Sequence, residues 1–109
     1  MTLAGDQEVP PVTSPGTCTG TIVVGADKSI SGSVTTTGVA GTAAHVHEAT
    51  AGENGPVIIP LTKDGDTYTV PPGAKLTDAQ FASFQAGNLY VNVHTAANPE
   101  GAMRGQLKP

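Results

Sequence analysis

The sequence lacks several features that particular classes of protein need. A single cysteine, Cys18, excludes an internal disulfide framework and any zinc or iron–sulfur site built from several cysteines. Only five Lys and Arg residues stand against nine Asp and Glu, and a formal net charge of −4 excludes the basic surface that binds nucleic acid. No apolar run approaches the roughly 18 residues of a membrane-spanning helix.

Aromatic residues are also scarce, which limits what the core can be made of. With two Tyr, two Phe and no Trp, the interior of this 109-residue chain must consist mostly of Val, Ile, Leu and Ala. Fourteen Gly, nine Pro and abundant Thr favour short strands and many turns over helices. The length is that of one domain, residues 1–109, which is large enough to fold around its own core without disulfides.

Turn-forming clusters divide the chain into short segments, spaced as in a β-sandwich or a β-barrel. Strands are predicted at Leu3–Val9, Thr17–Val24, Ser29–Thr37, Ala43–Glu48, Val57–Leu61, Thr67–Val70, Leu89–His94 and Ala102–Leu107. The Asp64-Gly65 pair indicates a hairpin turn between two of them. The pattern therefore predicts an all-β fold.

One segment breaks the pattern and predicts a short helix at about Asp78–Ala86. Thr77 is placed to cap its N-terminus, and Gln80, three residues later, completes a capping box. Gly87 supplies the left-handed residue that ends such a helix. We expect the helix to cover an end or edge of the β core with its two phenylalanines.

Three histidines form the one pattern that indicates a functional cluster. His45 and His47 lie two apart in a predicted strand, so both side chains project from the same face of it. In the strand that ends at His94, apolar residues occupy the alternate positions, which places His94 on an outer face as well. If the two strands are neighbours, about 4.8 Å apart, the three imidazoles converge on one point.

Three converging imidazoles suit a divalent metal ion. Such an ion needs nitrogen ligands at about 2.0–2.1 Å, and histidine is largely neutral and available at pH 7. Imidazole binds Cu(II), Zn, Ni or Fe, and intrinsic affinity favours copper, with zinc as the alternative. The competing interpretation is that the histidines are ordinary polar residues on a solvated face.

Four other residues are candidates for supporting roles. Glu8 or Glu53 could accept a hydrogen bond from a ligand imidazole and thereby fix its tautomer. Arg104 is predicted to be solvated or ion-paired, and near an open metal position it could steer an anion. The alternation around Cys18 predicts a small core residue, and the alternatives are a soft metal ligand or an exposed thiol that links a homodimer.

With these residues in view, the sequence resembles the CHRD domain, a β-rich module named from chordin and common in bacterial secreted proteins. The motifs that carry the resemblance run in family order over essentially the whole chain: GDQEVPP from Gly5, GTCTGT from Gly16, GTAAHVHE from Gly41, GENGPV from Gly52, AGNLYVNVHT from Ala86 and GAMRGQL from Gly101. The resemblance implies an immunoglobulin-like or Greek-key β fold and an exported location. The chain opens at MTLAG without a basic or apolar leader, so either the protein is cytoplasmic or the signal peptide is missing from this start, and we expect the second.

Two positions depart from the family pattern, and one short segment resembles another family. Ala102 stands where the family usually has Glu, and Cys18 stands where a small residue such as Gly or Ala is usual. His45–Glu48 is similar to the His-Val-His-Glu strand that copper–zinc superoxide dismutases present to copper. This similarity covers four residues and favours copper as the metal more than it favours the reaction.

The sequence thus predicts a small exported all-β domain, either a Greek-key or immunoglobulin-like β-sandwich or a flattened barrel. We expect it to bind one copper ion through His45, His47 and His94, for binding, sequestration or delivery of the metal. One alternative is a copper enzyme of the superoxide dismutase type, with Arg104 steering the anion. The other is an extracellular adhesion or interaction module in which the histidines are incidental.

Overall fold

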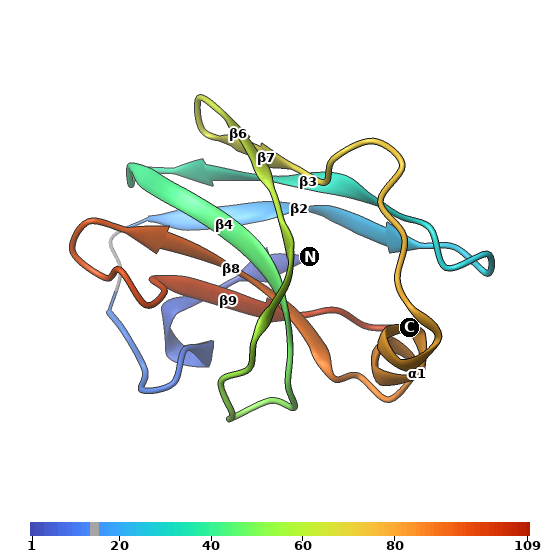
Figure 1. The fold of residues 1–109 in the computed structure, drawn as a ribbon. Coiled ribbons are helices and arrows are strands. Elements are labelled where there is room, and N and C mark those ends of the chain that lie inside the picture. Colours follow the sequence, from blue (N-terminus) through green and yellow to red (C-terminus); the bar gives the residue numbers. More distant parts are fainter. Residues whose placement is uncertain (14–15) are drawn as a thin grey trace.

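The computed structural model describes residues 1–13 and 16–109 and arranges them as two antiparallel β-sheets (Figure 1). The first sheet has the strand order β1 (Thr2–Leu3), β2 (Thr17–Val24), β3 (Ile30–Thr37), β7 (Thr67–Thr69) and β6 (Thr62–Asp64). The second has the order β5 (Val57–Pro60), β4 (Gly41–Glu48), β8 (Leu89–Thr95) and β9 (Met103–Gln106). A 3₁₀ helix, η1 (Gly5–Gln7), and one α-helix, α1 (Asp78–Gln85), complete the elements of the described residues.

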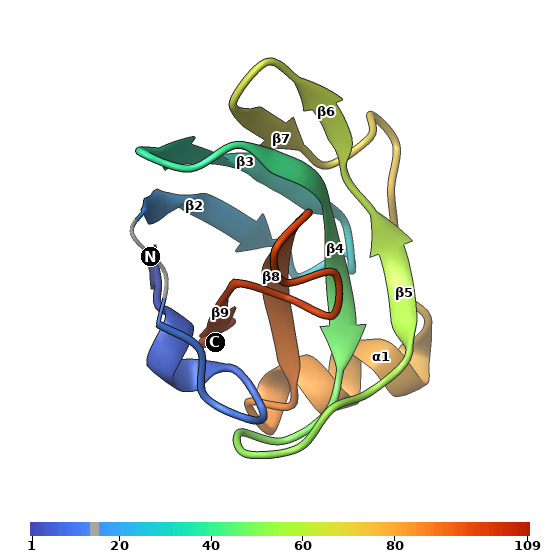
Figure 2. The same cartoon turned by 90° about the vertical axis from the view of Figure 1, so that its left-hand side faces the viewer.

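The two sheets pack face to face, as the predicted β-sandwich requires (Figure 2). The chain passes from one sheet to the other after β3, after β5 and after β7, so each sheet combines strands from distant parts of the sequence. Next to β1, Ala4 exchanges two backbone hydrogen bonds of 3.0 Å with Arg104 of β9. Within the described residues the sheets do not close into a barrel, so the sandwich alternative is the correct one.

The core lies between the sheets and is aliphatic, as the scarcity of aromatics predicts. In β8, the alternate residues Leu89, Val91 and Val93 are fully buried and face the other sheet. Val34 of β3, in the facing sheet, and Val46 of β4, the strand beside β8, are equally buried. Burial of such side chains contributes about 1.5–3 kcal/mol each, so this inner layer fixes which face of β4 and β8 points outward.

The predicted strands agree with the observed ones except at the start of the chain and between β5 and β7. The predicted strand Leu3–Val9 is wrong, because only Thr2–Leu3 is extended and the chain then turns into η1. At Gly5 any Cβ would collide with the carbonyl oxygen of Val12, so the chain folds back on itself there. Strand β6 was not predicted because all three of its residues are exposed and show no apolar alternation.

The helix begins and ends where its local signals place it. The Thr77 hydroxyl accepts the backbone N–H of Gln80 at 3.1 Å, and the Gln80 side chain accepts the backbone N–H of Thr77 at 2.9 Å. Gly87, with φ of +80°, follows the last turn. Phe81 and Phe84 pack against the core, so α1 covers one end of the sandwich (Figure 2). In the described part of the chain, no helix is long and apolar enough to cross a membrane.

Candidate metal centre

The pairing of β4 with β8 brings the three histidines together. The strands are antiparallel neighbours, with Ala43 opposite His94, His45 opposite Asn92 and His47 opposite Tyr90. Because alternate residues share a face, both strands turn their histidines away from the core. This is the adjacency that the sequence alone left open.

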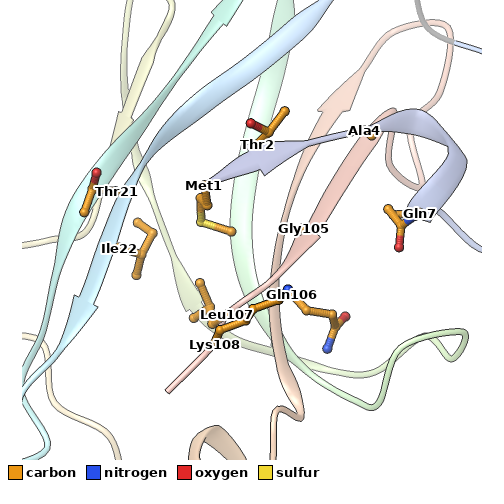
Figure 3. Close-up of a pocket in the computed structure, with 10 residues that line it drawn as sticks. All are labelled: Met1, Thr2, Ala4, Gln7, Thr21, Ile22, Gly105, Gln106, Leu107 and Lys108. Atoms are coloured by element: carbon orange, nitrogen blue, oxygen red, sulfur yellow. The ribbon is translucent and has the colours of Figure 1, made fainter.

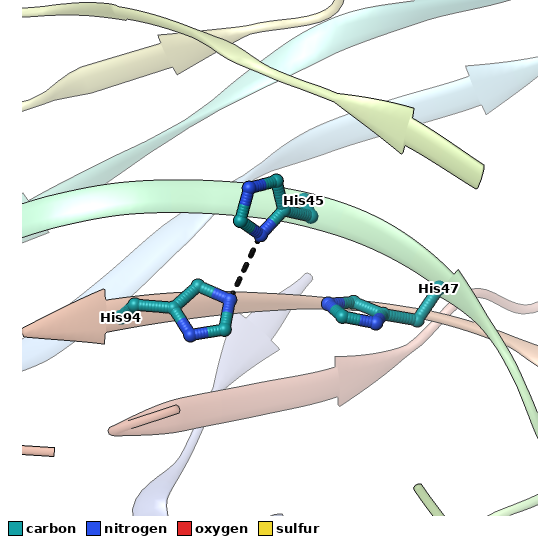
Figure 4. Close-up of side chains that lie close together, drawn as sticks. All are labelled: His45, His47 and His94. Carbon is teal, nitrogen blue, oxygen red and sulfur yellow. Dashed lines mark hydrogen bonds between the residues drawn. The ribbon is translucent and has the colours of Figure 1, made fainter. Parts of the chain in front are cut away.

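The three imidazole rings lie close enough to share one ion (Figure 4). One ring nitrogen from each of His45, His47 and His94 can be chosen so that all three lie within 4.8 Å of one another. The ring centroids of His45 and His94 are 4.7 Å apart, and that of His47 lies 5.7 Å from the first and 6.0 Å from the second. A small movement of these side chains would bring three nitrogens to metal-ligand distance from a common centre.

Two backbone carbonyls determine which ring nitrogen of His47 and of His94 keeps a lone pair for a metal ion. Nδ1 of His47 lies 3.0 Å from the carbonyl oxygen of Gly55, and Nδ1 of His94 lies 2.9 Å from that of Pro99. Because a carbonyl oxygen only accepts, both Nδ1 atoms carry the hydrogen and both neutral rings keep a lone pair on Nε2. His45 Nδ1, 2.9 Å from His94 Nε2, then donates to it. If the hydrogen of His45 moves to its own Nε2, the ring stays neutral and both facing nitrogens offer a lone pair to an ion.

One nitrogen of the histidine cluster, Nε2 of His47, has no hydrogen-bond partner among the described residues. In the described part of the chain, four buried side-chain atoms lack a hydrogen-bond partner: Glu8 Oε2, His47 Nε2, Tyr68 Oη and Asn92 Oδ1. His47 is 7% exposed, and leaving such a buried polar atom unsatisfied costs about 1–3 kcal/mol. Its Nε2 is the atom whose lone pair the Gly55 contact leaves free, so a metal ion bound there would supply the missing partner.

Burial favours the neutral form of two of the three rings, those of His45 and His47. The pKa of His45 lies below its usual range because of burial and because of repulsion from the His94 and His47 rings. The pKa of His47 is lowered as well, mainly by burial, although the Gly55 carbonyl and the adjacent Asn92 side chain partly oppose the shift. Neutral imidazole is the form that binds a metal, so protons compete weakly for these two residues.

Arg104 does not have the role that the sequence suggested for it. Its side chain is 1% exposed, and within the described residues it makes no salt bridge to a carboxylate. Nη1 donates to the Glu53 carbonyl oxygen at 2.6 Å, Nη2 donates to the Thr50 carbonyl oxygen at 2.9 Å, and Gln106 Oε1 accepts from both Nε and Nη2. Its guanidinium carbon lies 3.5 Å over the Tyr90 ring. An arginine held in this way cannot steer an anion arriving from solvent.

The two glutamates also lie differently from the expectation. Glu53 is exposed, and its backbone carbonyl rather than its carboxylate serves the site, by accepting from Arg104. Glu8 is 4% exposed, and its carboxyl group interacts with the side-chain amide of Asn92. Asn92 in turn lies next to His47. Burial raises the pKa of Glu8 to about 7, against the opposing effects of Asn92 and Arg104. The carbonyls of Gly55 and Pro99 therefore orient the ligand rings, which was the role predicted for the glutamates.

Cys18 belongs to the core and not to the histidine cluster. It lies on β2 in the other sheet, its side chain is 0% exposed, and burial raises the pKa of its thiol to about 11. The core interpretation is therefore correct. A thiol enclosed in this way reaches neither a second chain nor the histidine cluster, so the two alternatives for this residue do not fit the structure.

A separate pocket of about 630 Å³ lies between the first strand and the end of the chain (Figure 3). Its lining residues are Met1, Thr2, Ala4, Gln7, Thr21, Ile22, Gly105, Gln106, Leu107 and Lys108. None of them is a histidine, a cysteine or a carboxylate. The histidine cluster is thus the better-founded candidate site.

One comparison with known proteins identifies the family. The model of the CHRD domain matches residues 1–107, nearly the entire chain. The chain belongs to the CHRD domain family. No curated protein and no solved structure matches it. The β-rich architecture expected of a CHRD domain is the one observed.

Sequence reasoning missed several residues of this CHRD domain's site. Tyr90 and Asn92 alternate with His94, so their outward direction was readable, but their burial was not, because the sequence does not show what covers that face. Gly55 and Pro99 act through backbone carbonyls, which every residue type carries. No side-chain pattern could have singled them out.

Proposed function

We propose that this CHRD domain binds one copper ion through Nδ1 of His45, Nε2 of His47 and Nε2 of His94, and that it sequesters or delivers the metal. The observation that carries the proposal is the buried Nε2 of His47, which has no partner within the described residues and lies beside the paired nitrogens of the other two rings. Three protein ligands leave a further position open for water or for a donor from a metal-exchange partner.

Copper is favoured over zinc by the chemistry of the donor set. All three donors are neutral imidazoles, and copper is the divalent first-row ion that such nitrogens bind most tightly. A closed structural zinc site has four protein ligands, whereas the cluster in the described residues consists of three side chains. Export of the domain belongs to the same proposal and is supported by the resemblance of the chain to secreted CHRD modules.

Binding is favoured over catalysis by the state of Arg104. A dismutase would benefit from a cation at the open metal position, but the Arg104 guanidinium is enclosed, with its donors taken up by the turn of residues 49–56 and by Gln106. No observation in the described residues favours turnover, and an adhesion role does not account for the orphaned nitrogen of His47.

Copper titration tests the proposal. Purified protein without a histidine tag is titrated with Cu(II) in competition with a chelator, and EPR spectra are recorded at each step. We expect one equivalent to bind with nitrogen hyperfine structure, and we expect its affinity to fall at least tenfold in each of His45→Ala, His47→Ala and His94→Ala. Thr35→Ala, in the opposite sheet, is the matched control and keeps the affinity. Spectra of the wild type identical to those of free copper would overturn the proposal. If Zn(II) binds more tightly than copper, the proposed metal is zinc and not copper.

A further inference from the structure

Two side chains extend the proposed metal centre from His47 into the protein. Strand β8 lies between β4 and β9, so Tyr90 separates His47 on one side from Arg104 on the other. The rings of His47 and Tyr90 are stacked, 4.8 Å apart and 2° from parallel. The Arg104 guanidinium lies over the Tyr90 ring at 3.5 Å. A cation is therefore stacked behind one of the three ligands.

The same two side chains hold the loop that orients His47. Arg104 donates to the carbonyl oxygens of Thr50 and Glu53, both in the turn of residues 49–56. The backbone N–H of Gly55 donates to Tyr90 Oη at 3.0 Å, and the Gly55 carbonyl accepts from His47 Nδ1 at 3.0 Å. Arg104 is thus connected to the ligand twice, through the stacked rings and through the loop.

The charge of Arg104 is not neutralised by a salt bridge within the described residues. Its hydrogen-bond acceptors there are neutral, namely two backbone carbonyls and the Gln106 amide. In the same ranges, the one salt bridge joins Lys28 to Asp78 on the surface. The carboxyl group that interacts electrostatically with Arg104 is that of Glu8. Burial raises the pKa of Glu8 to about 7, so near neutral pH this group is ionised in only a fraction of the molecules. A positive charge in a poorly screened environment therefore faces the metal centre.

Such a charge discriminates between the two oxidation states of copper. Three neutral imidazoles leave the full charge of the ion in place, so the centre carries one positive charge with Cu(I) and two with Cu(II). Coulomb repulsion from Arg104 is twice as large for Cu(II), and the low local dielectric preserves the difference.

We infer that Arg104 is a positioning residue of the copper centre, and that through Tyr90 and residues 49–56 it makes Cu(I) the preferred ion. This inference rests on the proposed function. The domain would accordingly exchange reduced copper with a partner that presents Cu(I), and it would hold Cu(II) less tightly than Cu(I).

Paired affinity measurements test this inference. The affinity for Cu(I) is measured anaerobically in the presence of a reductant and a competing Cu(I) chelator, and the affinity for Cu(II) is measured with a competing Cu(II) chelator. We expect the wild type to bind Cu(I) at least tenfold more tightly than Cu(II). A tenfold change in this ratio corresponds to about 59 mV in the one-electron reduction potential. This measurement needs no variant, so it does not depend on whether a substituted protein folds.

Three variants then assign the preference to Arg104. In Arg104→Gln we expect the ratio of the two affinities to fall at least tenfold, whereas Arg104→Lys, which keeps the charge, retains most of the preference. Lys63→Gln removes an exposed cation from β6 and serves as the control for charge alone. Circular dichroism and melting curves establish that each variant is folded.

The outcomes separate the inference from the proposal beneath it. If neither oxidation state binds, both fail. If copper binds but Cu(II) is held as tightly as Cu(I), or if Arg104→Gln gives the same ratio as Lys63→Gln, only the inference is overturned. Equal weakening of both affinities in Arg104→Gln also overturns it, because a purely structural arginine would loosen the site for either ion without changing the ratio.

Discussion

Nδ1 of His45 and Nε2 of His94 lie 2.9 Å apart, although the two residues are 49 positions apart in the sequence. The contact exists because β4 and β8 pair with His94 opposite Ala43, which sets His45 diagonally across from it on the same face. The Pro99 carbonyl holds the hydrogen of His94 on Nδ1, so one hydrogen joins the pair when no ion is bound. A metal ion bound between the two nitrogens, with the hydrogen of His45 moved to its Nε2, would link the two strands more strongly.

Copper is therefore expected to stabilise the fold. An ion present at 100 times its dissociation constant adds about 2.7 kcal/mol to the free energy of unfolding. For a domain of this size that is roughly a 10 °C rise in melting temperature. Differential scanning calorimetry with and without copper measures the rise, and His94→Ala is expected to lose most of it. An equal rise in His94→Ala and in the wild type would show that copper stabilises the protein elsewhere.

Glu8 makes stability fall between mildly acidic and neutral pH. Its pKa rises from an ordinary 4.5 to about 7 because of burial, so the folded state favours the protonated form. The stability that this group contributes is complete below pH 4.5 and is lost as the pH rises to about 7. The shift corresponds to about 3 kcal/mol.

The variant Glu8→Gln isolates this effect. We expect it to gain about 3 kcal/mol relative to the wild type between pH 4 and pH 8, as measured by urea unfolding at both values. Titration of the histidines contributes to both proteins and cancels in the comparison. Parallel pH profiles for the two proteins would mean that the Glu8 carboxyl ionises normally in the fold.

Cys18 is expected to be unreactive in the folded protein. Its thiol is fully buried and its pKa is raised to about 11, so almost no thiolate is present or accessible at pH 8. A chromogenic disulfide reagent should label the folded chain on the order of 100-fold more slowly than the chain in urea, because labelling requires opening of the sandwich. Rapid labelling, or a dimer that dissociates on addition of reductant, would contradict the burial of this residue.

Thr77→Ala is expected to destabilise the fold without affecting the metal centre. It removes the hydroxyl that accepts the backbone N–H of Gln80 and so breaks the capping box, which costs about 1 kcal/mol. The melting temperature should fall by roughly 5 °C, and Thr77→Ser, which keeps the hydroxyl, should restore it. Copper affinity should be unchanged, because α1 packs on the core through Phe81 and Phe84. A parallel loss of copper affinity would connect the helix to the site.

Local patterns predicted the parts of the fold that depend on neighbouring residues. The capping box at Thr77 needs only the residues of the helix start, and it forms as expected. Strand β2 was predicted with its correct bounds, since turn residues flank a long run of alternating residues. The first strand was predicted too long because its end depends on a contact outside the strand pattern, the approach of Gly5 to Val12.

What the sequence by itself determined is the direction of the three histidines, because alternation along a strand is a local property and the apolar residues of β4 and β8 had to face the core. What only the tertiary structure decided is their convergence and their surroundings. Strand pairing set His45 against His94, and the carbonyls of Gly55 and Pro99 selected the nitrogens. The burial of Arg104 beneath residues 49–56 came from contacts across more than 50 positions, at a separation where side-chain patterns carry no information about neighbours.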